Sequence, residues 1–197
     1  WLLSFGARRD DGSPTADLGQ TPWPGTRRAW QWFAKGQFEG FSAQWMGVSH
    51  TVDTTYDATD SDRLNDTSQF VSLGHDAEPA PGWRTSLRWQ AGEHRYDYRY
   101  LRTGEGGYLD DTRTRGAWWA LDAQATWSGH EDHDLVMGLR LRRDPRLRYR
   151  YDVFDGSQVL SSMSREQASV SVEDRWRLRE SLALTLGVRL DQRSVAG

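Results

Sequence analysis

The chain has 197 residues, which suits one domain or one part of a larger one. Its 28 acidic and 25 basic side chains give a formal net charge of -3, which argues against broad electrostatic binding to nucleic acid. The absence of cysteine excludes disulfide frameworks, thiol catalysis and cysteine-ligated zinc. Only 37% of the residues are hydrophobic, yet 11 are Trp, and disordered chains contain few aromatic residues. A sheet with one apolar face and one solvated face is therefore favoured over disorder.

Alternation of apolar and polar residues is the strongest signal along the chain, and it predicts β-strands. In 182–190 every second residue is Leu or Val, and the residues between them are polar or small. The same alternation runs through 167–178, and the short polar turn at 179–181 joins the two segments into an antiparallel hairpin. In chain order, the predicted strands are 1–9, 28–38, 41–52, 67–75, 83–92, 117–127, 135–142, 167–178 and 182–190.

The connections between these strands alternate in length. Strands of this length exceed the usual five or six residues of globular sheets, whereas a strand that crosses a bilayer needs about 9–11 residues. The pattern predicts an all-β fold, an antiparallel up-and-down transmembrane β-barrel, of which the chain holds a fragment of about nine strands. Short turns are expected near 39–40, 77–82, 128–133 and 179–181, and long polar loops near 10–27, 53–66, 101–114 and 152–164.

Two groups of aromatic residues mark the expected edges of the membrane, because Trp and Tyr favour the interface. Asp174 is the one charged residue in the apolar pattern of 167–178. Its place near a short turn predicts that it lies at the membrane–water interface, where a carboxylate raises the free energy only slightly. The group beside the short turns is Phe38, Phe41, Trp83, Trp127 and Trp176, and the group at the loop ends is Tyr96, Tyr98, Tyr100, Tyr149 and Tyr151.

The other face of the predicted sheet is rich in charge of both signs, which suits a hydrated lumen and not hydrocarbon. We expect a salt-bridged wall, with docking to a plug or lining of a solute path as the functional alternative. The residues concerned are Arg84, Arg88, Asp122, Gln124, Arg140, Arg142, Glu173, Arg175, Arg177 and Arg189.

Segments 169–178 and 181–191 resemble the recurring hairpin of the barrel of TonB-dependent outer-membrane receptors. That hairpin has an acidic-basic-aromatic strand end, a short turn, and a Leu-Thr-Leu-Gly-x-Arg-x-Asp strand. Segment 133–144 is a looser copy, and 69–73 followed by 83–92 is similar to another hairpin of the family. The resemblance spans most of residues 28–195.

The resemblance implies uptake of a scarce, bulky ligand such as an iron-siderophore, a cobalamin or a glycan. Surface loops and a plug would capture the ligand, and TonB would supply energy by pulling on the plug. Neither a plug nor a signal peptide is found in residues 1–197, both ends look cut, and the plugged transporters have about 22 strands. We therefore expect a partial barrel in the outer membrane of a Gram-negative bacterium that meets TonB only through the missing plug, without a cofactor or an enzymatic activity.

Three polar stretches were weighed as binding sites. The stretch from His130 to His133 offers zinc ligands, but it lies in a predicted turn, and no metal site is predicted there. The stretch from Asp57 to Asp66 offers oxygen ligands without the spacing of a calcium loop, so a solvated loop is favoured and cation binding is left open. The basic stretch 142–150 favours contact with outer-membrane lipid and lipopolysaccharide over nucleic acid.

Two other classes of protein stay open on the sequence alone. One is a soluble β-sandwich that binds glycans through exposed Trp. The other is an outer-membrane enzyme barrel, but His50, His75 and His94 lie in no recognisable catalytic motif. No catalytic residue is predicted, and the ligand is not identified.

Overall fold

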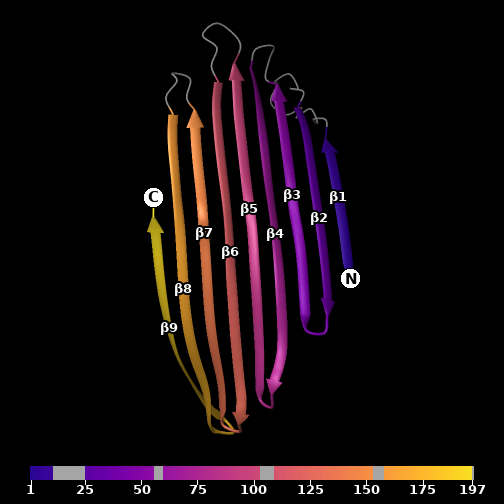
Figure 1. Ribbon diagram of the computed structural model, residues 1–197. Coiled ribbons are helices and arrows are strands. Elements are labelled where there is room, and N and C mark those ends of the chain that lie inside the picture. Colours follow the sequence, from indigo (N-terminus) through magenta and orange to yellow (C-terminus); the bar gives the residue numbers. More distant parts are fainter. Residues whose placement is uncertain (11–24, 56–59, 103–108, 153–157, 197) are drawn as a thin grey trace.

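The computed structural model describes residues 1–10, 25–55, 60–102, 109–152 and 158–196. They form one antiparallel sheet in which nine strands follow one another in sequence order (Figure 1). This arrangement confirms the predicted up-and-down order of strands, with β1 and β9 as the two outermost strands. The strands are β1 (Leu2–Asp10), β2 (Gly25–Phe38), β3 (Phe41–Thr55), β4 (Asp60–Ala80), β5 (Trp83–Arg102), β6 (Leu109–His130), β7 (His133–Asp152), β8 (Gln158–Arg179) and β9 (Leu182–Ala196).

Several strands are longer than the sequence predicts. Much of the expected loop 53–66 is paired strand, because β3 continues to Thr55 and β4 begins at Asp60. Polar cross-strand contacts hold this extension: Thr51 donates a hydrogen bond to Asn65 at 3.0 Å, and Arg63 forms an ion pair with Asp53. Such pairs stabilise a sheet without the apolar alternation on which the prediction depended. No helix in the described ranges is long and apolar enough to cross a membrane.

The four predicted short turns are present, at 39–40, 81–82, 131–132 and 180–181, and they lie at one end of the sheet (Figure 1). Gly40 and Gly82 have φ of +82° and +76°, values that glycine adopts without the cost of a side chain. Three of these turns are hydrogen-bonded to the first strand of the next hairpin, because the carbonyls of Gly40, Gly82 and Asp132 accept hydrogen bonds from backbone N–H groups of β4, β6 and β8.

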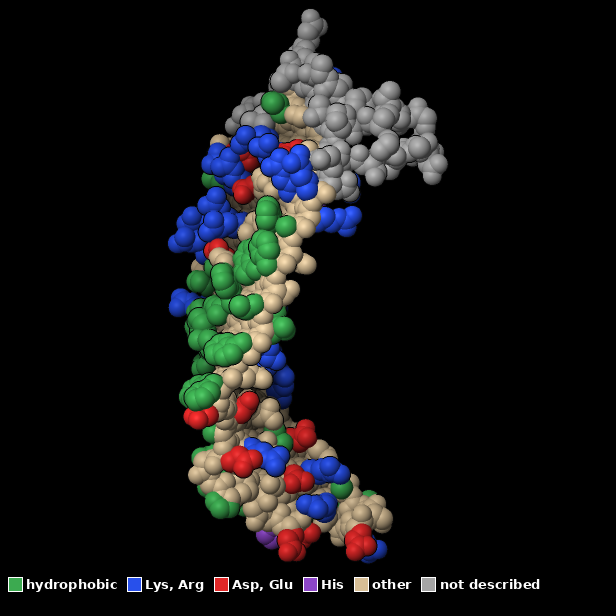
Figure 2. Space-filling model, turned by 90° about the vertical axis from the view of Figure 1, so that its right-hand side faces the viewer, with side chains coloured by type: hydrophobic (Ala, Val, Ile, Leu, Met, Phe, Trp, Pro, Cys, Tyr) green, Lys and Arg blue, Asp and Glu red, His purple; other side chains and the backbone are tan. Residues whose placement is uncertain are grey.

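Strand alternation and register divide the sheet into two faces, here called the apolar face and the polar face. One row of paired residues defines the polar face: Arg88, Asp122, Arg140, Ser169 and Asp191. Figure 2 shows a bowed sheet with hydrophobic side chains gathered along its convex side. The apolar band, which is the hydrophobic part of the apolar face, includes Trp45, Leu73, Leu87, Trp89, Leu121, Ala123, Leu139, Leu141, Val170, Val172, Leu186, Val188 and Leu190.

The sheet is a single layer, and its apolar band is uncovered. Among the described residues, Ala120 is the only hydrophobic residue that is fully buried, whereas large side chains such as Leu186 and Leu190 are exposed. A β-sandwich would cover this face with a second sheet, and the described residues form none. The soluble β-sandwich is therefore wrong as an interpretation of these strands, and lipid or another partner must cover the band.

Rings of tryptophan lie over glycines of neighbouring strands. On the apolar face, a Cβ atom on Gly47 would lie 2.0 Å from Cζ2 of Trp32. We expect Gly47→Ala to displace this ring and to lower the free energy of unfolding by about 1–3 kcal/mol, measured by urea unfolding of the receptor in lipid vesicles. The control is Gly187→Ala, where the nearest atom would lie 3.6 Å away and little change is expected. Equal unfolding midpoints for the two variants would contradict this prediction.

Candidate functional site

The charged residues predicted to share one face do so. The strand registers place Arg84, Arg88, Arg142, Gln124, Glu173 and the other predicted members on the polar face. Ion pairs cross this face, with Arg140 at 3.5 Å from Asp122 and Arg189 at 2.9 Å from Asp191. The predicted salt-bridged wall is therefore present in these strands.

A polar hollow of about 500 Å³ lies in the middle of this wall. Small residues such as Gly138 and Ser171 form part of its lining, and three arginines project around it: Arg88, Arg140 and Arg189. Arg189 also donates a hydrogen bond to Ser169 at 3.5 Å. A hollow with several guanidinium groups can bind an anionic group of a ligand or a protein segment on the polar face.

Asp144 is a buried carboxylate in the same wall, with only 2% of its surface exposed. Arg142 donates a hydrogen bond to it at 3.0 Å and Arg165 donates another at 2.6 Å. The guanidinium of Arg142 also lies 5.0 Å from the ring centre of Trp118, which in turn stacks on Phe70 at 6.0 Å. The sequence interpretation missed Asp144, although the following Pro145 was a usable signal, since proline within a strand indicates a bulge.

The five tyrosines at the loop ends lie on the polar face, so the prediction that they form a lipid-facing belt is wrong. In β5 the tyrosines occupy even positions, on the same side as Arg88. In β7 the register shifts between Asp144 and Leu147, and this bulge exchanges the faces of odd and even residues beyond it. We call this group the tyrosine panel: Tyr96, Tyr98, Tyr100, Tyr149 and Tyr151.

The tyrosine panel lies beyond the apolar band and carries acidic neighbours. Asp62 and Asp110 both pair in register with Tyr100, and Asp66 pairs with Tyr96. Burial, together with the nearby Asp62 carboxylate, raises the pKa of Tyr98, so its hydroxyl stays protonated at neutral pH. The panel thus offers flat aromatic faces, hydroxyl groups and carboxylates to a ligand on the polar side of the sheet.

The aromatic residues near the short turns lie on the apolar face, as predicted. Phe38 pairs directly with Phe41, and Trp83 pairs with Trp127. Asp174 lies beside this group, and its carboxylate is 2.8 Å from Nδ1 of His133. The His133 ring stacks on Trp176 at 5.6 Å. His133 is therefore the partner of Asp174, a contact that the sequence interpretation missed.

The described residues of the two stretches considered for cations form no metal site. No group of three His, Asp or Glu side chains that could hold a metal occurs in the parts of the chain that the structure describes. Residues 57–59 lie outside those parts. Asp62 and Asp66 lie on the polar face, but Asn65 lies on the other face and accepts a hydrogen bond from Thr51 at 3.0 Å. The expected solvated loop is therefore strand from Asp60 onward.

The structure brings Ser68, His94 and Asp66 together, but not as a catalytic triad. Ser68 Oγ lies 2.8 Å from Nδ1 of His94, and Asp66 lies 3.4 Å from the same nitrogen. In a triad the serine and the carboxylate contact opposite nitrogens of the ring. The ring of His75 packs against that of Phe41, with 4.2 Å between the ring centres.

Comparison with known proteins identifies the family. The family model described as TonB dependent receptor-like, beta-barrel matches residues 1–197. The crystal structure of the beta domain of the Bordetella autotransporter Brka is similar, with 16% identity, a TM-score of 0.44, and coverage of 98% of this chain and 78% of that chain. No curated protein matches. Because the family model spans every residue, the chain belongs to the TonB-dependent receptor-like β-barrel family, a family of transporters rather than enzymes.

Proposed function

We propose that this chain forms part of the wall of an outer-membrane receptor that takes up a scarce, bulky ligand with energy supplied through TonB. The observation that carries the proposal is the single-layer sheet with two unlike faces. Its apolar band needs lipid around it, and its opposite face carries ion pairs such as Arg140 with Asp122, which need a hydrated interior. A Gram-negative outer membrane is the setting in which such barrels occur.

The tyrosine panel supports a role in ligand contact. Aromatic faces stack on flat rings and on the C–H faces of sugars, so the panel favours a ring-bearing ligand such as an iron chelate, a cobalamin or a glycan. Asp62, Asp66 and Asp110 favour a neutral or cationic ligand over a polyanion, because like charges repel.

Uptake assays with the complete receptor test this proposal. Cells that lack the receptor gene are complemented with wild type, and uptake is measured for a ferric hydroxamate, a ferric catecholate, cyanocobalamin and an oligosaccharide. We expect one probe to be taken up, and its uptake to stop when TonB is deleted. Replacing Tyr98 and Tyr151 by alanine removes two rings of the tyrosine panel and is expected to weaken binding of that probe about tenfold or more.

The control is Thr112→Val, which lies between these two tyrosines in register and removes a hydroxyl without removing a ring. Uptake of a probe that persists without TonB would contradict the energised mechanism. Normal binding by the alanine variant would leave the receptor assignment intact and exclude the panel as the contact surface.

A further inference from the structure

Three arginines form a row on the apolar face, just beyond the apolar band. Arg95 pairs directly with Arg115, and Arg115 pairs directly with Arg148. The three side chains therefore project side by side from β5, β6 and β7, and we call them the arginine row. Figure 2 shows Lys and Arg side chains gathered past one end of the hydrophobic region. Like charges directly opposite one another destabilise a sheet, so this row needs negative charge from elsewhere.

The charges farther from the apolar band are balanced, in contrast to the arginine row. Arg113 lies 2.6 Å from Asp111, and Arg150 lies 2.8 Å from Asp152. The two aspartates pair in register and lie on the same face as the arginine row. Hydrogen bonds from Arg113 hold the pKa of Asp111 below its ordinary range, so this carboxylate is ionised and is already paired with Arg113.

Most of the arginine row has no such partner. Arg95 lies 3.3 Å from Glu93. Arg115, Arg148 and the nearby Arg146 are exposed, and no carboxylate of the described residues lies within ion-pair distance of them. The expectation that the whole basic stretch 142–150 meets lipid is therefore narrowed, because Arg142 faces the polar side and Arg150 is paired with Asp152.

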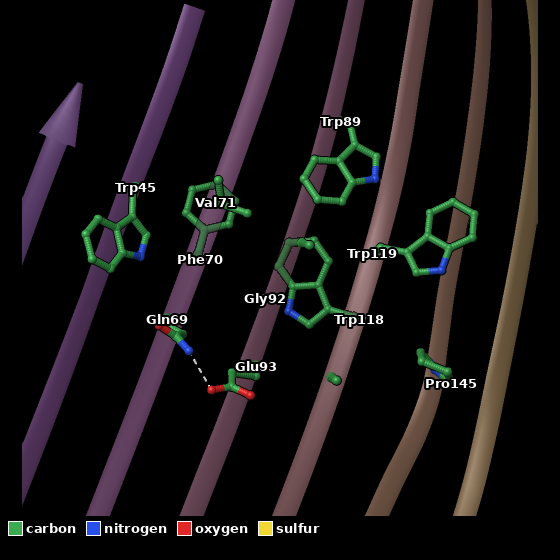
Figure 3. A pocket seen from close by; sticks show the side chains of 12 residues that line it. Trp45, Gln69, Phe70, Val71, Trp89, Gly92, Glu93, Trp118, Trp119 and Pro145 are labelled. Carbon is green, nitrogen blue, oxygen red and sulfur yellow. Dashed lines mark hydrogen bonds between the residues drawn. The ribbon is translucent and has the colours of Figure 1, made fainter. Parts of the chain in front are cut away.

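An aromatic hollow of about 710 Å³ adjoins the arginine row on its membrane side (Figure 3). Trp45, Trp89 and Trp119 stand around it, and the small side chains of Ala91 and Ala117 leave its floor open. Trp119 follows Arg115 by four residues in β6, a separation of about 13 Å along the strand. An exposed cationic row thus lies one headgroup length from an apolar hollow on the same face.

We propose that the apolar face of β5–β7 binds a phosphorylated glycolipid of the outer leaflet, with its phosphate on the arginine row and its apolar part in the aromatic hollow. Guanidinium groups match phosphate oxygens in paired hydrogen bonds, and a phosphate on the arginine row supplies the negative charge that the three arginines need. The hollow explains why a lipid, and not a free anion, is the occupant. The proposal depends on the proposed function only for the outer-membrane setting.

Binding of lipid A to the complete receptor in detergent, followed by native mass spectrometry, tests the proposal. We expect diphosphoryl lipid A to bind more tightly than dephosphorylated lipid A, phosphatidylglycerol or inorganic phosphate. Replacing Arg115 and Arg148 together by alanine is expected to weaken lipid A binding at least about tenfold, since charge-assisted hydrogen bonds are lost. The matched control is Arg63→Ala, an arginine of the same face that is paired with Asp53, for which affinity is expected to stay within about twofold.

A second variant tests the hollow without changing charge. Ala117→Phe fills the floor of the hollow, and we expect it to weaken lipid A binding severalfold while leaving the heat-dependent mobility of the folded barrel on gels unchanged. Equal lipid A affinity in the arginine variant and wild type would overturn the proposal, as would binding of inorganic phosphate or phosphatidylglycerol as tight as that of lipid A. Absence of the wild-type receptor from the outer membrane would contradict the proposed function instead, because lipid binding in detergent is measured independently of location.

Discussion

Leu139→Arg is expected to impair insertion of the barrel and to lower its stability. Leu139 is exposed on the apolar face, in a row with Leu87, Ala123, Val170 and Leu190. An arginine in the middle of a lipid-facing band costs about 2–4 kcal/mol, because its charge must leave water for hydrocarbon. We expect a lower yield in the outer membrane and a lower urea midpoint for unfolding in lipid vesicles.

Gln124→Arg is the matched control for this substitution. Gln124 belongs to β6 and is exposed on the polar face, where it pairs with Gly138, the residue before Leu139. The same arginine side chain then lies in a hydrated interior, and little change in yield or midpoint is expected. Similar losses in both variants would show that lipid does not cover the apolar face, and would contradict the membrane assignment.

Asp144→Ala is expected to destabilise the barrel by about 2–3 kcal/mol. The substitution leaves Arg142 and Arg165 without the carboxylate that both contact. Removing one partner of a fully buried pair costs about 3–5 kcal/mol, and we expect a smaller loss here because these arginine side chains are 28% and 31% exposed and reach some water. Urea unfolding of the purified receptor in vesicles measures the change.

The control for Asp144 is Asp191→Ala. Asp191 also pairs with an arginine on the polar face, at 2.9 Å, but that pair is half exposed and little change is expected. If the two variants unfold at the same urea concentration, the double arginine contact at Asp144 contributes no more than a surface ion pair.

The strands that face the membrane could be predicted because each has one apolar side. The alternation in 182–190 and 117–127 assigned those residues to faces that the registers confirm. Beyond the apolar band both sides of a strand are polar, so alternation disappears and the extension of β4 to Asp60 could not be seen. Alternation alone would place Tyr149 and Tyr151 on the side of Leu139 and Leu141, but one bulge in β7 reverses every residue that follows it.

The contacts between distant residues were harder to predict than the strands. Asp144 and Arg165 are 21 residues apart, and their contact depends on the register between β7 and β8. The same is true of His133 and Asp174, which are 41 residues apart. An unexpected acidic residue in the apolar pattern was visible in the sequence, but its histidine partner was not, because register decides which residues are opposite.

The hydrogen bonds from three of the turns to the neighbouring hairpins also indicate how the strands are inclined in the bilayer. Gly40 is level with Asp76, yet β4 continues to Ala80, and β6 and β8 likewise run past the levels of Gly82 and Asp132 (Figure 1). Every hairpin is thus displaced in the same direction, by between one and two residues per strand. With a rise of about 3.3 Å and a spacing of about 4.8 Å, this shear inclines the strands by roughly 40° to the membrane normal. That inclination is within the range of outer-membrane barrels, and a stagger of this kind is what closure of a sheet into a barrel requires.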